Sequence, residues 1–213
     1  AWIASRLAQY DPKILIYCHA ICDVARCEVN PDWAYAMNVQ HVKRVLTALP
    51  EQTRLVYVSS DHVFGGDGVY DETSPVSPIS VYGRTRVEAE QLVLKRNRTL
   101  VIRPGLAIGA SPDGRTGHLD WLRYRTEKNL PMTIVADEHR SVVWAADLSM
   151  RVMDLAKSAE LGTRHVPATR CVSRVELADH LMHLLGQVPR FQVTRRHQRP
   201  TPHLGRVELA SCY

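Results

Sequence analysis

Short apolar runs alternate along this chain with longer segments whose apolar residues recur at helical spacing. We expect buried strands at five of these runs: "KILIYCHA", "RLVYVSS", "TLVIRPGLAIG", "MTIVAD" and "TRHVPAT". Helices that alternate with apolar strands predict an α/β fold, in which a doubly wound parallel sheet is covered by helices on both faces. This alternation restricts the chain to a small number of architectures.

Helix boundaries are marked by prolines and capping residues. The segment 31–50 begins with Pro31 and ends at Pro50, and Ser173 precedes a helical pattern that stops near Gly186. Glu176 lies three residues after Ser173, which predicts a capping box. Further helices are expected over 1–10, 80–97, 118–130 and 144–159, and the turn-rich segment 65–78 is expected to be a loop.

Composition excludes several classes of protein. Hydrophobic residues make up 45% and the net charge is +5, which fits one globular domain with a sizeable core. The densest basic stretch, "TRRHQRP", has no interleaved aromatic residues, so we expect no nucleic-acid partner. No apolar run approaches the roughly 18 residues of a membrane span and no signal peptide is visible, so we expect a cytoplasmic protein without a membrane partner.

The cysteines do not predict a metal site. They number five, and Cys18, Cys22 and Cys27 fall close together without forming a paired Cys-x-x-Cys frame. The histidines also lack metal-ligand spacing beside carboxylates. Reduced thiols and no bound metal are the expectation.

Polar residues follow three of the predicted strands. The strand exits are "CHA" at 18–20, "SSDH" at 59–62 and "RPG" at 103–105. In a parallel α/β sheet, ligands bind beyond the carboxyl ends of the strands. We therefore expect the chemistry of this chain at these three exits.

Tyr82 and Arg86 are four residues apart at the start of a predicted helix and so share one face. A tyrosine, with a reference pKa of about 10, transfers protons poorly unless its anion is stabilised. A unit charge about 4 Å away contributes on the order of 4 kcal/mol at an effective dielectric near 20. Arg86 can supply that field, but it cannot relay protons because arginine does not deprotonate in proteins.

An ordered set of motifs resembles the extended short-chain dehydrogenase/reductase superfamily, and within it the dTDP-4-dehydrorhamnose reductase group. "SSDHVF" is similar to the group's Ser-Thr-Asp-Tyr-Val-Phe segment, "VYDE" to its Pro-Tyr-x-Glu loop, and "VYGRTR" to its Tyr-Gly-x-x-Lys helix start. "CDVARCEVNPDWAYAMNV" and "RPTPHLGRVEL" are similar to its Val-Asp-x-x-Glu…Asn segment and its closing Arg-Pro motif. The likeness covers nearly all of residues 11–209.

The resemblance implies a Rossmann-like fold with a small C-terminal substrate-binding lobe. It places the cofactor domain at residues 1–105 plus 141–156 and the lobe at 106–140 and 157–213. The implied cofactor is NADPH or NADH, and the implied substrate is a nucleotide-linked 4-keto sugar. A homodimer is compatible with the sequence.

The resemblance also implies the site residues. Ser60 polarises the ketone, Tyr82 donates a proton, Arg86 replaces the usual lysine, and Asn38 helps to hold a proton-relay water. The residues expected to bind the cofactor are Ala1, Ala4, Cys18, His19, Ala20, Ser59, Arg103 and Pro104. The residues expected to bind the substrate are Asp61, His62 and Arg199.

The N-terminus departs from the pattern of the superfamily. "AWIASRLAQ" is similar to the end of a Gly-x-x-Gly-x-x-Gly fingerprint, with Ala1 and Ala4 at the second and third glycine positions. The next segment, from Asp11, is similar to a much later strand. We therefore expect further chain before Ala1 and between about Gln9 and Asp11, with loss of the adenosine-binding half as the alternative.

Two other functions stay open. A non-catalytic nucleotide-binding or regulatory subunit of the same fold is favoured by Arg86 and the missing glycine loop. A nucleotide-sugar epimerase or dehydratase is the alternative within the superfamily, although dehydratases usually carry an acidic pair and "SSDH" offers only Asp61.

Overall fold

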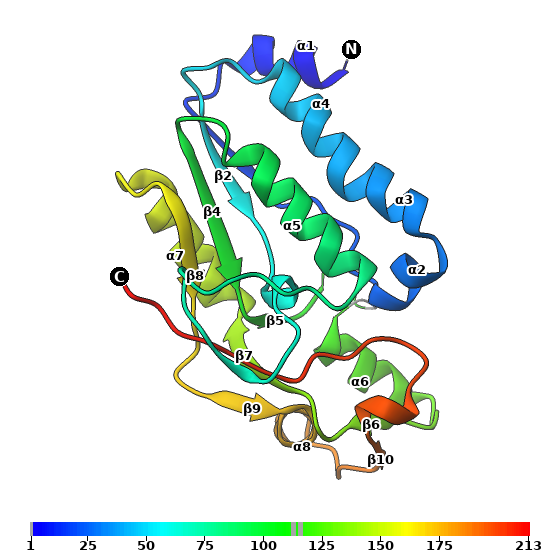
Figure 1. Ribbon diagram of the computed structural model, residues 1–213. Coiled ribbons are helices and arrows are strands. Elements are labelled where there is room, and N and C mark those ends of the chain that lie inside the picture. The colour runs from blue at the N-terminus through cyan, green and yellow to red at the C-terminus, as the bar shows by residue number, and fades with distance from the viewer. Residues whose placement is uncertain (1, 112–113, 115–116) are drawn as a thin grey trace.

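The fold centres on a four-stranded parallel sheet, seen in the computed structural model of Figure 1, which describes residues 2–111, 114 and 117–213. The strand order is β1–β2–β4–β8. These strands are β1 (Ile14–Tyr17), β2 (Arg54–Val58), β4 (Thr99–Pro104) and β8 (Gly162–Val166). All three pairings are parallel, which confirms the predicted sheet and its Rossmann-like class.

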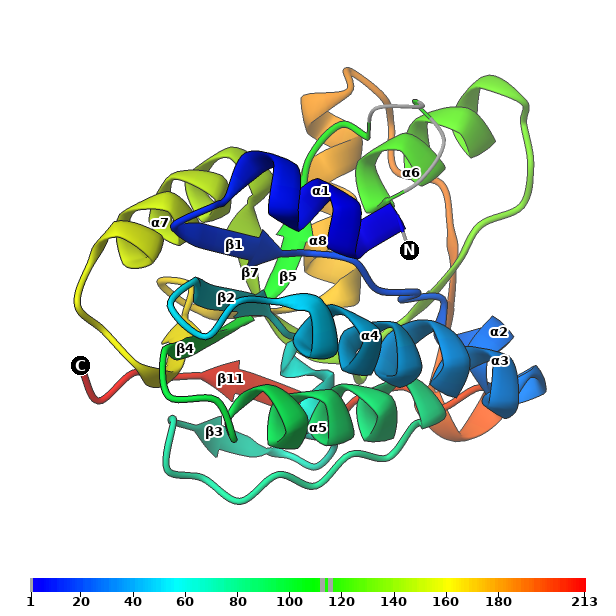
Figure 2. The ribbon, with the colours of Figure 1, turned by 90° about the horizontal axis from the view of Figure 1, so that it is seen from above.

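Helices cover both faces of this sheet, as Figure 2 shows from above. In β2, Leu55 and Tyr57 pack with residues of α1, α4 and α5, whereas Val56 packs against α7 on the other face. Because side chains alternate along a strand, the one apolar run of β2 contributes to the apolar cores on both faces of the sheet. The helices are α1 (Trp2–Tyr10), α4 (His41–Ala48), α5 (Val81–Val93) and α7 (Ala145–Lys157).

A second group of strands carries the rest of the chain. The strand order is β3–β11–β7–β5, and β9 pairs antiparallel with β7. The members are β3 (Gly68–Tyr70), β5 (Leu106–Ile108), β7 (His139–Trp144), β9 (Cys171–Ser173) and β11 (Arg206–Leu209). Beside them, β6 (Thr133–Val135) pairs with β10 (Gln192–Thr194), and α6 (His118–Glu127) packs with α8 (Arg174–Leu184) over a separate apolar core.

The predicted strand "TLVIRPGLAIG" is divided between the two sheets. It forms β4 and β5, with Gly105 at the break. A Cβ added at Gly105 would lie 2.2 Å from the carbonyl oxygen of Ser141 in β7, so only glycine fits where the chain crosses to the second sheet. The predicted loop at 65–78 contains the short strand β3, which sequence analysis missed.

The predicted helix over 31–50 is irregular. It consists of α3 (Pro31–Tyr35), a π-helical turn over Ala36–Gln40, and α4, with the short α2 (Val24–Val29) before it. A π-helical turn holds an extra residue and turns side chains onto a different face. Here it brings Asn38 and Val39 to full burial.

The predicted cap of α8 is confirmed in part. Ser173 accepts a hydrogen bond of 3.0 Å from the backbone N–H of Glu176, and Gly186 follows the helix with φ of 67°. The Glu176 carboxylate, however, pairs with Arg170 at 2.5 Å. The prediction of a reciprocal capping box was therefore wrong, because a nearby cation competes for the carboxylate.

The sheets do not follow the predicted domain boundaries. β8 lies within residues 157–213, which were assigned to the lobe, yet it pairs with β4 in the central sheet. β7 begins at His139 and pairs with β5, β9 and β11 in the second group. The division into a cofactor domain and a lobe stays a prediction.

Glu72, which follows β3, connects β8 with the C-terminal tail of the chain. Its carboxylate accepts hydrogen bonds from the backbone N–H groups of His165 and Cys212, at 2.8 and 3.0 Å, and from the hydroxyl of Ser211 at 2.7 Å. Burial raises the pKa of Glu72, but these hydrogen bonds outweigh it and lower the pKa to about 2. Glu72 therefore holds the C-terminal tail against β8.

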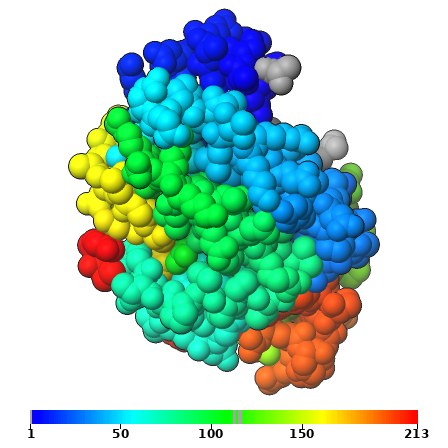
Figure 3. All heavy atoms as spheres, turned by 45° about the horizontal axis from the view of Figure 1, so that its top comes forward, coloured from blue at the N-terminus to red at the C-terminus, as the bar shows by residue number. Residues whose placement is uncertain are grey.

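The helix α1 lies at one end of the molecule. Figure 3 shows it (dark blue) beyond α4, and both Trp2 and Tyr10 are largely exposed. Leu7 and Ile3 attach it to the core formed with α4 and β1. Among the described residues, no helix combines the length and apolar character needed to cross a bilayer.

Gly83 allows α5 to approach the turn that follows β2. A Cβ added there would lie 2.3 Å from the carbonyl oxygen of His62. Alanine normally stabilises a helix by about 1 kcal/mol relative to glycine, but overpacking against rigid backbone costs about 1–3 kcal/mol or more. We expect Gly83→Ala to lower the free energy of unfolding by about 2 kcal/mol, measured by urea denaturation. The neighbouring exposed Arg84, changed to Ala, serves as the control and should change it by less than about 0.5 kcal/mol.

Candidate functional site

A cavity of about 530 Å³ opens at the carboxyl ends of β2 and β4. Ser59 and Ser60 line it from the exit of β2, Pro104 and Gly105 from the exit of β4, and Tyr82 from α5. The C-terminal segment 199–204 also lines the cavity. It contributes Arg199, Thr201, Pro202, His203 and Leu204. The cavity lies at two of the three polar strand exits where the chemistry was expected; Cys18, His19 and Ala20 of the third exit do not line it.

The first turn of α5 fixes Tyr82 inside this cavity. Ser80 caps the helix by accepting a hydrogen bond of 3.0 Å from the backbone N–H of Gly83. Tyr82 is 5% exposed, lines the cavity together with Ser60, and packs edge-on against the ring of His62 at 5.2 Å between centroids. The two hydroxyl-bearing residues that the sequence singled out thus line the same cavity.

Arg86 lies one turn further along α5 and is completely buried. Its guanidinium donates to the carbonyl oxygen of Val58 and lies 4.7 Å from the centre of the Tyr57 ring. Its Nε and Nη1 have no acceptor among the described residues. A buried guanidinium with unpaired N–H groups is costly, so this position favours a ligand that can accept hydrogen bonds.

The pKa of Tyr82 reflects a competition. Burial raises it above its ordinary value, and the charge of Arg86 and the hydrogen bond with Ser60 lower it in part. Arg86 therefore acts in the predicted direction but does not bring the net pKa below that of a free tyrosine. Tyr82 is a protonated hydroxyl at neutral pH, which suits a proton donor.

Asn38 is placed away from the cavity lining and is fully engaged. Its Oδ1 accepts from the backbone N–H of Ile21 at 2.7 Å, and its Nδ2 donates to the Ile21 carbonyl and to Thr85 Oγ1 at 3.1 and 3.0 Å. Thr85 in turn donates to the carbonyl oxygen of Tyr82 at 2.7 Å. Asn38 is thus linked to the backbone of Tyr82 only through Thr85, and its predicted role at a relay water stays a prediction.

A buried ion network forms one wall of the cavity. The Arg140 Nε donates to Asp61 Oδ2 at 2.7 Å, its Nη2 contacts Asp61 Oδ1, and its Nη1 donates to Glu138 at 3.1 Å. His203 contacts the same Glu138 through Nδ1 at 2.8 Å. Asp61 and His62 were predicted to bind substrate. Asp61 does line the cavity, but its carboxylate is occupied by Arg140.

Two histidines at the cavity are held in the neutral form. Burial and then the charge of Arg140 lower the pKa of His62 to about 4. Burial and then the charges of Arg174 and Arg140 lower the pKa of His118 to about 3. Neither ring carries a charge at neutral pH.

The remaining predicted cofactor residues are spread over the sheet edge. Ser59 and Pro104 line the cavity, whereas the Arg103 side chain turns inward and pairs with Glu90 at 2.7 Å. Cys18, His19 and Ala20 follow β1 as predicted, and Ala4 is exposed on α1. Ala1 lies outside the described residues. Arg199 is exposed and lies at the rim of the cavity.

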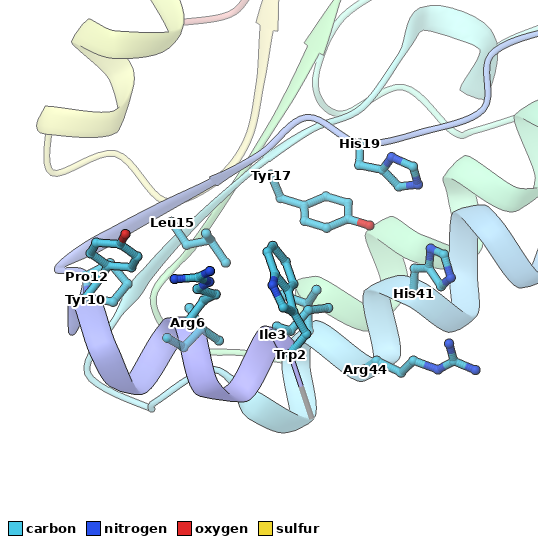
Figure 4. A pocket seen from close by; sticks show the side chains of 12 residues that line it. Trp2, Ile3, Arg6, Tyr10, Pro12, Leu15, Tyr17, His19, His41 and Arg44 are labelled. Carbon is cyan, nitrogen blue, oxygen red and sulfur yellow. The ribbon is translucent and has the colours of Figure 1, made fainter.

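A larger cavity of about 610 Å³ lies between α1, β1 and α4. Figure 4 shows its mainly apolar and aromatic lining, in which Trp2 and Tyr17 point toward one another and His19 lies near His41. It borders β1, which is an edge strand of the central sheet. Neither Ser60 nor Tyr82 contributes to it, so the candidate site is the smaller cavity.

Sequence analysis missed several charged residues of the site. Arg140 is a lone cation inside "EHRSVVW", a run that forms β7, and this was the one available signal. Glu138, His118 and Arg174 come from segments far apart in the chain, and nothing in their spacing shows that they meet. Among the described residues, no group of three or more His, Cys, Asp or Glu side chains could hold a metal ion.

Comparison with known protein families identifies this arrangement. Residues 2–205 match the model of the RmlD substrate binding domain family. The chain belongs to this family. The predicted resemblance to the dTDP-4-dehydrorhamnose reductase group is therefore confirmed.

Members of the family from other organisms are moderately similar. The chain is 28% identical over 201 residues to a dTDP-4-dehydrorhamnose reductase of Streptomyces griseus, covering 89% of this chain and 64% of that protein. It is 29% identical over 184 residues to the spore coat polysaccharide biosynthesis protein SpsK of Bacillus subtilis, covering 83% and 62%. The chain spans less than two thirds of the length of these relatives.

Solved structures show the same fold. A dTDP-4-dehydrorhamnose reductase of Bacillus anthracis superposes with a TM-score of 0.87 at 24% identity, covering 97% of this chain and 74% of that one. The UDP-glucose 4-epimerase of Thermotoga maritima superposes with a TM-score of 0.82 at 16% identity, covering 97% and 71%. At these identities the likeness concerns the fold.

We expect loss of the cation in the ion network at the cavity to lower the free energy of unfolding. Arg140→Met leaves Asp61 and Glu138 buried without their cation, and breaking such a pair costs about 3–5 kcal/mol of unfolding free energy. Adding Asp61→Asn should recover part of that loss. Urea denaturation measures both. The exposed pair of Arg206 with Glu208 offers the control, since Arg206→Met should cost less than about 1 kcal/mol. An equal effect of the two single variants would contradict the buried network.

We expect the free energy of unfolding to depend on pH through the buried neutral histidine His62. The folded pKa of His62, about 4, lies below the unfolded value of about 6.5. Its contribution to stability is thus fully present above pH 6.5 and is lost as pH falls toward 4, with a slope approaching about 1.4 kcal/mol per pH unit per proton. Urea denaturation at several pH values between 7 and 5 measures the free energy of unfolding. This free energy should fall less steeply with decreasing pH for His62→Gln than for the wild type. An unchanged slope would mean that His62 titrates normally in the folded chain.

Proposed function

We propose that this protein reduces the ketone of a nucleotide-linked 4-keto sugar with NADPH or NADH. The observation that carries the proposal is that Ser60 and Tyr82 line the same cavity of a chain that belongs to the RmlD substrate binding domain family. Relatives of the chain are named dTDP-4-dehydrorhamnose reductases, and the one from Bacillus anthracis is in complex with NADP.

A nicotinamide cofactor would lie where Ser59 and Pro104 line the cavity. Arg86 is not part of that lining; its Nε and Nη1, which have no acceptor among the described residues, would donate to a hydroxyl or carbonyl of a cofactor that reaches behind Tyr82. The exit of β1, with Cys18, His19 and Ala20, would provide further contacts. When bound, the cofactor supplies the hydride.

The residues of the chain polarise the ketone, donate the proton and hold the proton donor in place. Ser60 donates a hydrogen bond that polarises the ketone oxygen of the substrate, and Tyr82 donates the proton that this oxygen gains. The tyrosinate left behind is stabilised by the positive charge of Arg86. Asn38 and Thr85 hold the backbone of Tyr82 in place through their hydrogen bonds.

A second candidate function is a non-catalytic nucleotide-binding or regulatory subunit. It is favoured by Arg86, which donates to Val58 and cannot relay a proton as lysine can. A homodimer and a cytoplasmic location stay predictions, and light scattering on the purified chain checks the first of them.

The proposal is tested by NADPH oxidation with a panel of nucleotide-linked 4-keto sugars. Tyr82→Phe should abolish turnover while NADPH binding, followed by fluorescence, changes little, because the phenol donates the proton without anchoring the cofactor. Unchanged turnover would remove Tyr82 from the mechanism.

Arg86 separates the two candidate functions. Arg86→Lys keeps the charge and should keep or raise turnover. Arg86→Met should lower it by more than tenfold, since each 1.4 kcal/mol of lost stabilisation is about tenfold in rate. A methionine variant as active as the wild type would exclude the electrostatic role. If the wild type and both variants bind NADPH but reduce no sugar of the panel, the binding subunit is the better description.

A further inference from the structure

Arg174 is a cation at the cavity with no carboxylate partner among residues 2–111, 114 and 117–213. It is the first residue of α8, and its backbone N–H donates to the carbonyl oxygen of Glu138 at 2.9 Å, which fixes the helix start beside β7. Within the described part of the chain, the hydrogen-bond contacts of its guanidinium are with the ring of His118, with Nη1 3.1 Å from Nε2 and Nη2 2.9 Å from Nδ1. Arg103 and Arg140, in contrast, each bind a carboxylate.

His118 cannot satisfy this guanidinium. A neutral imidazole has one acceptor nitrogen, so only one of the two short contacts is a hydrogen bond, and a protonated ring would have no acceptor. Burial lowers the pKa of Arg174, which the Glu138 charge raises again in part, so the charged form is held in a poorly solvated place. The fork of the guanidinium is therefore available to a partner with two acceptor oxygens.

The charges around the cavity favour an anion. Among the described residues, its lining contains three arginines, Arg140, Arg174 and Arg199, against two carboxylates, Asp61 and Glu138. Both carboxylates are already bound to Arg140. The described lining residues thus carry one positive charge in excess, and within this part of the chain Arg174 and Arg199 are the lining cations without a carboxylate partner.

We infer that Arg174, held in place by His118, binds a phosphate of the diphosphate that links nucleoside and sugar in the substrate. This inference rests on the proposed function, since it places the charged part of the substrate in the cavity that contains Ser60 and Tyr82. Arginine suits the task because its planar fork donates two parallel hydrogen bonds to phosphate oxygens. Arg174 is then a specificity residue, which admits nucleotide-linked sugars and gives no advantage to free sugars.

Calorimetric titration of the purified chain with dTDP and with thymidine tests the inference. Arg174→Met should weaken dTDP binding by at least about tenfold and leave thymidine binding unchanged, because only dTDP carries the phosphates. Arg174→Lys should give an intermediate affinity for dTDP, since the charge remains and the fork is lost. The matched control is Arg170→Met, because Arg170 is an exposed arginine near the same helix that pairs with Glu176 and does not line the cavity.

The outcomes are distinct from those of the activity assay. Equal dTDP affinity in the wild type and Arg174→Met, with both folded by circular dichroism, overturns the inference, as does a wild type that binds dTDP no better than thymidine. If Arg174→Met does not fold, the lysine variant decides, because an unchanged dTDP affinity there overturns the bidentate contact. A chain that binds dTDP through Arg174 but reduces no sugar supports this inference while the proposed reductase fails.

Discussion

The ion pair between Asp61 and Arg140 is the contact on which the candidate site depends. Asp61 follows a strand of the central sheet and Arg140 belongs to the second group of strands, so the pair joins the two parts of the fold beneath the cavity. Burying two charges is expensive unless the geometry is good and the remaining valences are used. Here Glu138 and His203 complete the network, and Ser60 Oγ donates to Asp61 Oδ1 at 3.3 Å.

The chemistry of Tyr82 depends on a balance between burial and charge. An enclosed tyrosine resists ionisation, and a cation one turn along the helix only moderates that resistance. Arginine in this place keeps a permanent charge but also binds the carbonyl oxygen of Val58, which anchors it to the strand. The site therefore combines a strong, fixed field with little capacity to pass protons onward.

The middle strands of the central sheet, β2 and β4, could be predicted because they are buried on both faces and contain apolar runs. Ser60 and Tyr82 could also be predicted, since strand exits and the start of a helix leave local signals. β3, β7, β9 and β11 could not, because each is stabilised by partners distant in the chain, as β3 is by β11. Arg140, Glu138 and Arg174 were missed for the same reason, since the residues they contact come from distant parts of the chain.

The π-helical turn at Ala36–Gln40 has a consequence for the evolution of the chain. One extra residue in a helix rotates everything on one side of it by about 100°, and here that rotation coincides with the full burial of Asn38. A single-codon deletion within this turn would restore a regular helix. It would also turn either α3 or α4 away from the face it now buries, and so remove the amide that connects Ile21 with Thr85. In this segment, substitutions are therefore better tolerated than changes of length.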